Sequence, residues 1–380
     1  MKNYLTLFLM LITFNSYAQF TISGKVLNKT DKKPIANAVA FFNKTGIASN
    51  TNNNGNFALT NIAGGQYLLL ITVVGYERYT LPITLTADMH LPDIELSPKT
   101  DTLAQVAVKG KAKISPYYYT FRNDFLGSTL FARQCKIANP WVIHFSKTDT
   151  MGNYTAKSNG FIDIENGALG YRIKLLLNFF TKQDKTNSAN HTDRTDYDGE
   201  SYFEEMKGTP EQERQWQKNR MECYQGSQMQ FLRAILSGNA RQQGYLIKKA
   251  YLKKNPHYDP IEIYDDPFDD PYLYKIKDTV LKEQDILRRT DKHGLFAIAR
   301  VDSNPNSCLY VEYLGAKTSK KQARVPWIWR DTQSYILFDK PYAVFDYHGV
   351  INTHGNITFT GFLGEARIAN QLPEDFEPGQ

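Results

Sequence analysis

The stretch that decides the fold begins GKVLNKTDKKPIANAVAFF (residues 24–42) and includes GGQYLLLITVVGY (residues 64–76). Between residues 20 and 97, short alternating or β-branched runs are separated by turn residues about every 8–12 positions. Asn54-Gly55 fits a tight hairpin turn, because both residues tolerate a positive φ. About seven short strands at this spacing predict a β-sandwich.

The first eighteen residues have the three parts of a secretory signal peptide. Lys2 supplies a positive charge, Tyr4–Phe14 is apolar, and Ser16-Tyr17-Ala18 predicts cleavage before Gln19. The apolar run is shorter than the roughly 20 residues that a membrane-spanning helix needs. A buried N-terminal strand or helix is the alternative. We expect an exported protein in the periplasm, at the outer membrane or on the cell surface, with no transmembrane helix after signal removal.

Composition divides the chain into a signal peptide (1–18), a β-sandwich (19–97), a linker (98–116) and a larger part (117–380). Strand-like runs dominate the larger part, and a mobile polar loop or hairpin tip is expected over residues 181–199. The only clear helical stretch lies near residues 209–238, where Gly226-Ser227 separates two helices. The predicted fold class is mainly β: a sandwich followed by a larger β-rich α+β domain with a helical hairpin.

Several motifs of the front part carry a family resemblance. They are Gly24-Lys25-Val26, Pro34-Ile35-Ala36-Asn37-Ala38-Val39, Asn54-Gly55-Asn56-Phe57, Gly65-Gln66-Tyr67 and Val74-Gly75-Tyr76. Residues 20–110 resemble the carboxypeptidase regulatory-like domain, a transthyretin-like sandwich of exported Bacteroidetes proteins. Leu103–Val108 is similar to the strand that follows this domain in many TonB-dependent receptors. The resemblance implies an accessory module without catalytic residues.

Motifs of the larger part resemble uncharacterised exported Bacteroidetes proteins that carry the same front domain. These are Asp124–Ser128, Asn166–Tyr171, Arg220–Leu232 and Leu372–Asp375. This second resemblance implies an architecture and assigns no activity.

A zinc-carboxypeptidase site would need a His-x-x-Glu pair and a distant His, because catalytic zinc takes three protein ligands. None of the seven histidines is followed three residues later by glutamate. No Gly-rich phosphate loop or GxSxG motif occurs. The sequence therefore favours a protein without catalytic activity or cofactor.

Two segments supply candidate ligand-binding residues. Asp265, Asp266, Asp269 and Asp270 lie in an acidic, proline-rich run that offers carboxylate oxygens to Ca²⁺ but lacks EF-hand spacing. A solvated acidic loop is the alternative. Trp327 and Trp329 lie in Pro326–Trp329 and form either a surface for sugar or protein, or part of an ordinary core strand.

Other candidate residues have plainer alternatives. Asp346, His348 and His354 are near in sequence and form either a metal site or ordinary turn residues. Arg220 and Arg233 mark either a functional helix face or helices packed on a sheet. Cys135, Cys223 and Cys308 are far apart, so one disulfide with a free thiol, or three buried thiols, both fit.

The charge of the chain argues against a nucleic acid as its partner. The net charge is only +6 and the basic pairs are scattered, which disfavours nucleic-acid binding. We predict an exported cell-envelope binding or structural protein whose partner is an envelope protein or a glycan. An envelope hydrolase acting on peptide or glycan, and a surface carbohydrate-binding protein, are the alternatives.

Overall fold

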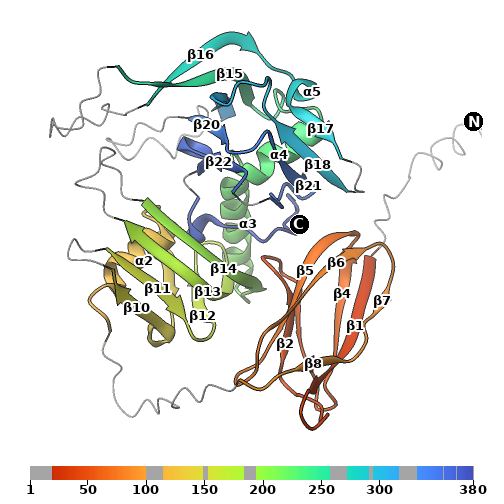
Figure 1. Ribbon diagram of the computed structural model, residues 1–380. Coiled ribbons are helices and arrows are strands. Elements are labelled where there is room, and N and C mark those ends of the chain that lie inside the picture. Colours follow the sequence, from red (N-terminus) through yellow and green to blue (C-terminus); the bar gives the residue numbers. More distant parts are fainter. Residues whose placement is uncertain are drawn as a thin grey trace, which may run out of the picture. The chain divides into compact units, whose positions relative to one another are not determined.

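The fold is given by a computed structural model (Figure 1). It describes residues 19–99, 114–148, 153–183, 194–256, 272–290, 294–315, 332–353, 355–364 and 366–379. The predicted signal peptide and most of the predicted linker lie outside these ranges, so their boundaries stay predictions.

The described residues form two compact units. Residues 19–43 and 47–99 belong to the first, and residues 44–46 belong with the described residues from 114 onward to the second. Strands dominate both, which confirms the mainly β fold class.

The first unit is a sandwich of two sheets, ordered β4-β1-β7, with β8 also paired to β1, and β3-β2-β5-β6. Its strands are Gln19–Asn28 (β1), Val39–Phe42 (β2), Ala48–Asn50 (β3), Asn56–Ala63 (β4), Gly65–Thr72 (β5), Tyr79–Leu85 (β6), Met89–His90 (β7) and Ile94–Leu96 (β8). Alternate residues of β1, such as Ile22 and Val26, and residues of β5, such as Leu69 and Ile71, are fully buried in one core. Burial of alternate side chains is what makes the two sheets pack face to face.

The turn at Asn54-Gly55 forms with the backbone that the sequence predicts, but it is not a hairpin. Gly55 has φ +76°, and a Cβ there would lie 2.5 Å from the carbonyl oxygen of Val26. The flanking strands β3 and β4 pair with β2 and β1, in different sheets. The turn therefore carries the chain from one sheet to the other, and glycine is required by both φ and space.

The second unit contains two main hydrophobic cores. Its first core lies under a six-stranded antiparallel sheet, in which the long β13 pairs with β14 on one side and with β12 and β11 on the other. The elements are Tyr118–Leu126 (α2), Cys135–Ile137 (β9), Ile143–Lys147 (β10), Tyr154–Ser158 (β11), Ile162–Asn166 (β12), Tyr171–Gln183 (β13) and Arg194–Glu205 (β14). Strands β13 and β14 pair as a hairpin, so the loop or hairpin tip expected over residues 181–199 is too long, because residues 181–183 and 194–199 belong to these strands.

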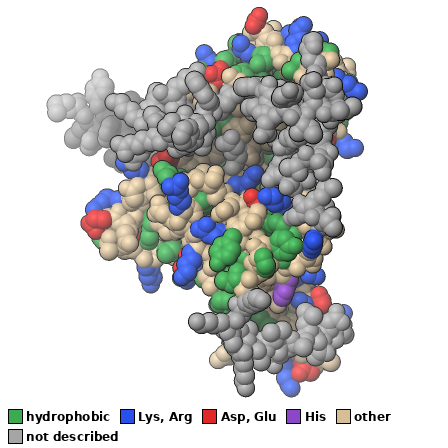
Figure 2. Space-filling view, turned by 90° about the vertical axis from the view of Figure 1, so that its left-hand side faces the viewer, with side chains coloured by type: hydrophobic (Ala, Val, Ile, Leu, Met, Phe, Trp, Pro, Cys, Tyr) green, Lys and Arg blue, Asp and Glu red, His purple; other side chains and the backbone are tan. Residues whose placement is uncertain are grey.

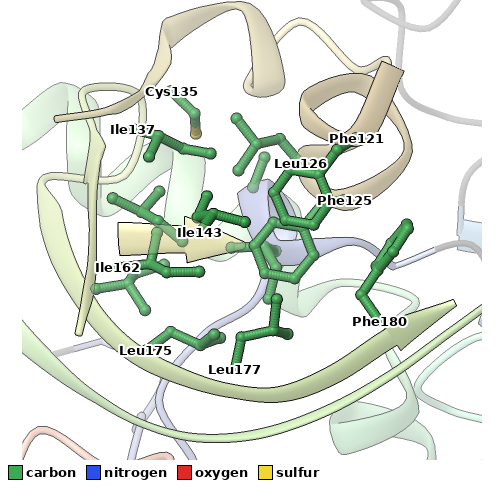
Figure 3. Close-up of a cluster of buried hydrophobic side chains, with 14 of the residues drawn as sticks. Phe121, Phe125, Leu126, Cys135, Ile137, Ile143, Ile162, Leu175, Leu177 and Phe180 are labelled. Carbon is green, nitrogen blue, oxygen red and sulfur yellow. The ribbon is translucent and has the colours of Figure 1, made fainter. Parts of the chain in front are cut away.

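Helix α2 covers one face of this sheet, and the sequence analysis missed it. Phe121, Phe125 and Leu126 project from it onto Ile143, Leu177 and Phe180, as Figure 3 shows. The helix begins after Tyr117, with no side-chain cap and no acidic residue in its first turn. It lacks the local start signals that helices usually carry. Its stability therefore comes from burial of its aromatic face.

The second core lies between a five-stranded sheet, ordered β16-β15-β19-β20-β22, and a three-stranded sheet, ordered β17-β18-β21. The elements are Tyr245–Lys254 (β15), Tyr272–Val280 (β16), Glu283–Ile286 (α5), Leu287–Arg289 (β17), Leu295–Ala299 (β18), Ser307–Tyr313 (β19), Gln333–Phe338 (β20), Tyr342–Asp346 (β21) and Ile357–Phe359 (β22).

Both predicted helices are confirmed, as α3 (Pro210–Tyr224) and α4 (Gln228–Leu236). Thr209 and Gln212 cap α3 reciprocally, and the Ser227 hydroxyl accepts a hydrogen bond from the Gln230 amide at the start of α4. The expectation that the pair packs on one sheet is wrong. The buried face of α4 lies in the second core, whereas buried side chains of α3 contact the turn between β12 and β13.

Replacing Phe121 by alanine tests the first core. Phe121 is fully buried and its ring lies 4.8 Å from the ring of Phe125 and 4.9 Å from that of Phe180. Phe121→Ala should lower the free energy of unfolding by about 3–5 kcal/mol in urea denaturation, because it leaves a cavity. Tyr119→Ala, at the exposed face of the same helix, should change it by less than about 0.5 kcal/mol. Equal effects of the two substitutions would contradict this packing.

Candidate functional site

The ligand-binding residues that the sequence suggests lie outside the described residues. Asp265, Asp266, Asp269 and Asp270 fall in the segment 257–271, Trp327 and Trp329 fall in the segment 316–331, and His354 is also outside. All of these stay predictions. The flanking strands are described: β15 and β16 border the acidic segment, and β19 and β20 border the tryptophan segment. Because Tyr251 pairs with Ser307 and Tyr245 with Tyr313, these borders lie at opposite ends of one sheet.

Within the described part of the chain, no three His, Cys, Asp or Glu side chains are placed to hold a metal ion. Asp346 and His348 are close, but they form a turn. One carboxylate oxygen of Asp346 accepts hydrogen bonds from the His348 amide at 3.0 Å and from the Val350 amide at 3.1 Å. The carboxylate thereby fixes the backbone after β21.

The helix face that carries Arg220 is buried against the turn Gly167–Gly170, which joins β12 to β13. Three side chains of α3 donate to successive carbonyl oxygens of this turn. Trp216 Nε1 donates to Gly167 at 2.9 Å, Asn219 Nδ2 to Ala168 at 2.6 Å, and Arg220 Nε to Leu169 at 2.8 Å. We call Trp216, Asn219 and Arg220 the α3 anchor. The anchor satisfies carbonyl groups that burial would otherwise leave without a partner.

Arg220 makes further contacts from the same position. Its guanidinium lies 3.9 Å from the centre of the Tyr171 ring, and Nη1 donates to a Glu205 carboxylate oxygen at 2.7 Å. Nη2 donates to the Gly170 carbonyl at 3.4 Å. The planar guanidinium of arginine can donate several hydrogen bonds and stack on a ring at the same time, which the ammonium group of lysine could not do. Arg220 therefore holds the backbone and is not available to a ligand.

Glycine is required at one position of the turn. Gly170 has φ +69°, and a Cβ there would lie 2.2 Å from the Trp216 ring. Any other residue would be strained and would displace the anchor.

Arg233 of α4 has a similar role in a different place. Its Nε donates to the carbonyl of His348 at 2.8 Å, and its Nη1 donates to the carbonyl of Phe376 at 2.9 Å. The side chain thus joins the turn after β21 to the C-terminal segment. Both arginines therefore have a structural role and do not form a functional helix face, since they contact the protein's own backbone and side chains.

The three cysteines are free in this structure. Cys135 and Cys308 are buried and Cys223 is half-buried, and burial raises the pKa of each thiol to about 12. A thiol with such a pKa is a poor nucleophile at neutral pH. The geometry therefore favours three structural thiols.

An aromatic surface that the sequence analysis missed lies on the five-stranded sheet. One face of this sheet points into the second core, through residues such as Ile247, Val311 and Ile336. Side chains on the opposite face form a smaller apolar cluster. We call it the aromatic face; its members are Ala250, Tyr274, Cys308, Tyr310, Tyr335 and Leu337.

The register of the strands explains how the aromatic face forms. Ala250 pairs with Cys308 and Tyr310 pairs with Tyr335, and paired residues project from the same side of a sheet. The small side chains of Ala250 and Cys308 leave room above them. The ring of Tyr274, from β16, stacks on that of Tyr335, from β20, with centroids 3.6 Å apart and planes 12° apart.

The aromatic face is half-buried. Tyr310 is 6% exposed, whereas Tyr274, Tyr335 and Leu337 keep intermediate exposure. A sequence signal for it existed: SCLYVEY (residues 307–313) is apolar at consecutive positions, which is typical of a strand with two apolar faces. Its partners on β15 and β16 could not be identified without the register.

A polar group lies at the border of the same sheet. Lys249 donates to Asp302 at 2.5 Å, and the Tyr251 hydroxyl donates to the same carboxylate oxygen at 3.0 Å. The hydrogen bond from Lys249 is the main cause that lowers the pKa of Asp302 to about 2. Asp302 therefore stays ionised well below the usual range of aspartate.

Comparisons with known proteins identify the first unit. Residues 22–108 match the family model of the CarboxypepD_reg-like domain. The first unit is therefore similar to the CarboxypepD_reg-like domain. The match extends beyond residue 97, where the sequence analysis placed the end of the sandwich. A search of the curated proteins found no match.

Solved structures resemble about a fifth of the chain. A type II cohesin–X-dockerin complex of Acetivibrio cellulolyticus is 24% identical, over 20% of this chain and 56% of that chain, with a TM-score of 0.19. The major pilin subunit BcpA of Bacillus cereus is 13% identical, over 22% and 31%, with a TM-score of 0.19. Hydroxyquinol 1,2-dioxygenase of Pseudomonas putida is 9% identical, over 23% and 58%, with a TM-score of 0.19.

These structural similarities do not indicate a function. This chain spans little more than half of the first structure, and the set includes both an enzyme and a pilin. In the described residues, no helix has the length and apolar character to span a membrane. On the face in Figure 2, Lys and Arg side chains are scattered among other types.

Replacing Arg220 tests the α3 anchor. Arg220→Ala leaves the Leu169 carbonyl without its donor, which costs about 1–3 kcal/mol, and it removes the contacts with the Tyr171 ring and Glu205, whereas the Gly170 carbonyl keeps its hydrogen bond from the Met206 amide. We expect a loss of about 2–4 kcal/mol in the free energy of unfolding. Arg214→Ala removes an exposed arginine of the same helix and should cost less than about 0.5 kcal/mol. A loss that small for Arg220→Ala would rule out the anchor.

The stability contributed by Asp302 should depend on pH. Because its pKa is lowered in the folded state, this contribution is present above about pH 4, the range of the unfolded-state pKa, and is lost as the pH falls toward 2. We expect Asp302→Asn to lower the free energy of unfolding at pH 6 by about 0.5–1 kcal/mol, since the pair is partly exposed. The difference should vanish near pH 2. The control is Asp278→Asn, and a difference independent of pH would refute the assignment.

Proposed function

We propose that the protein is an exported binding or structural protein of the cell envelope, without a catalytic activity of its own. The observation that carries the binding role is the five-stranded sheet with two apolar faces, of which one lies in a core and the other is the half-buried aromatic face. Apolar surface left at a sheet face is typical of a site that contacts another molecule.

The first unit supports the same proposal. The first unit is a small β-sandwich that matches the CarboxypepD_reg-like domain, and this resemblance implies an accessory role. The signal-peptide pattern of residues 1–18 supports export. In this proposal the first unit is an attached module, and the second unit carries the surface that contacts the partner. The partner is an envelope protein or a glycan.

Fractionation of cells that express the full chain tests this proposal. We expect a mature protein beginning at Gln19 in the periplasmic or outer-membrane fraction, and cross-linking there should retain a partner. The control is a chain without residues 1–18, which should stay in the cytosol. Full-length protein in the cytosol with residues 1–18 intact, or turnover of a peptide or glycan by the purified chain, would refute the proposal.

A further inference from the structure

We propose that Asn159 is a site of spontaneous deamidation in the folded protein, and that the fold protects the other two asparagines that are followed by glycine. The chain contains three Asn-Gly pairs, at residues 54–55, 159–160 and 166–167. Asparagine deamidates most readily before glycine, because glycine has no Cβ to hinder attack by its backbone nitrogen. The dipeptide is the same at all three places, so only the surroundings of each pair can distinguish them.

The reaction needs a free backbone N–H beside a free side chain. The glycine nitrogen loses its proton to hydroxide and attacks Cγ of the asparagine. The new C–N bond closes a succinimide ring, and the side-chain nitrogen takes up a proton and leaves as ammonia. Water then opens the ring at either carbonyl and gives aspartate or isoaspartate. A hydrogen bond from the glycine N–H, or burial of either residue, opposes the first step, because that hydrogen bond must break and the backbone must turn.

Asn159 and Gly160 meet these conditions in the turn between β11 and β12. Asn159 is exposed, and its side chain makes no hydrogen bond in the part of the chain that the structure describes. Among the same described residues, the Gly160 N–H has no acceptor. A Cβ at Gly160 would meet no atom within 4 Å, so the space around this glycine is open. The Asn159 N–H donates to the Val142 carbonyl at 3.1 Å, but neither atom takes part in ring closure.

Asn166 is in the opposite situation. It is fully buried, its side-chain amide donates to the Ala369 carbonyl at 3.0 Å, and its side-chain oxygen accepts a hydrogen bond from the Leu169 amide at 3.1 Å. The Gly167 N–H donates to the Gln134 carbonyl at 3.1 Å. Ring closure would break all three hydrogen bonds. It therefore requires the structure around this turn to open.

Asn54 lies between these two extremes. Its side chain is exposed, but Gly55 is buried and its N–H donates to the Asn52 carbonyl at 2.9 Å. The Gly55 carbonyl accepts a hydrogen bond from the Val26 N–H at 2.8 Å, so this glycine is held on both sides. Attack on the Asn54 side chain therefore requires the turn to open locally.

Ageing of the purified full chain tests the inference. Folded protein is incubated at mildly alkaline pH, and samples taken over time are digested and analysed by mass spectrometry for the replacement of each amide by a carboxyl group. We expect Asn159 to be converted at least tenfold faster than Asn54, and Asn166 to be the slowest. The same chain unfolded in urea is the control. Because unfolding removes the protection, the three rates should then agree within about threefold.

Two variants test the chemistry at this site. Gly160→Ala places a methyl group in the open space beside the attacking nitrogen, and it should slow the conversion of Asn159 at least tenfold in both folded and unfolded protein. Asn159→Gln should abolish the early acidic form of the folded protein in isoelectric focusing. Both variants should melt at the temperature of the unmodified chain, because the turn lies outside the strands.

Three outcomes would overturn the inference. The first is conversion of Asn54 or Asn166 as fast as that of Asn159 in the folded protein. The second is an unchanged Asn159 in the folded protein over a period in which urea-treated protein is converted at all three sites. The third is conversion of Asn159 at the same rate in Gly160→Ala, which would exclude attack by the residue 160 nitrogen.

Discussion

The second unit depends on helix side chains that take the place of missing backbone hydrogen bonds. In the turn between β12 and β13, the carbonyl groups of Gly167, Ala168 and Leu169 accept hydrogen bonds from helix side chains and not from a neighbouring strand. The donors are the three side chains of the α3 anchor. One of them, Arg220, also contacts the Tyr171 ring and Glu205. A buried carbonyl without a donor is costly, so the position of α3 on the first core is closely fixed.

Buried polar side chains also link the two cores of the second unit. Helix α4 follows α3 directly, buries its apolar side in the second core, and uses Arg233 to hold the C-terminal segment. That segment returns to the first core, where the Asn166 side chain donates to the Ala369 carbonyl at 3.0 Å. Two chain connections, each fixed by buried polar side chains, therefore join the cores. The second unit is expected to unfold as one cooperative structure.

The features that the sequence predicted depend on residues close together in the chain. The features that it missed depend on contacts between residues far apart in the chain. The sandwich and the two helices near residues 209–238 follow from turn residues and short spacings. Helix α2 has no such signal, because packing of Phe121 and Phe125 stabilises it. Arg220 was noted as a candidate, but its partners at residues 167–170 lie about fifty positions away. The aromatic face depends on the register of four strands, which no single stretch reveals.

The central claim is that the helices and the C-terminal segment make the two cores one cooperative unit. Hydrogen exchange of the full chain, followed by mass spectrometry at increasing urea concentration, measures this directly. The account predicts that protection of β13 in the first core and β19 in the second core is lost at the same urea concentration, because one global opening exposes both. Loss of protection in one of these strands while the other stays protected would contradict it.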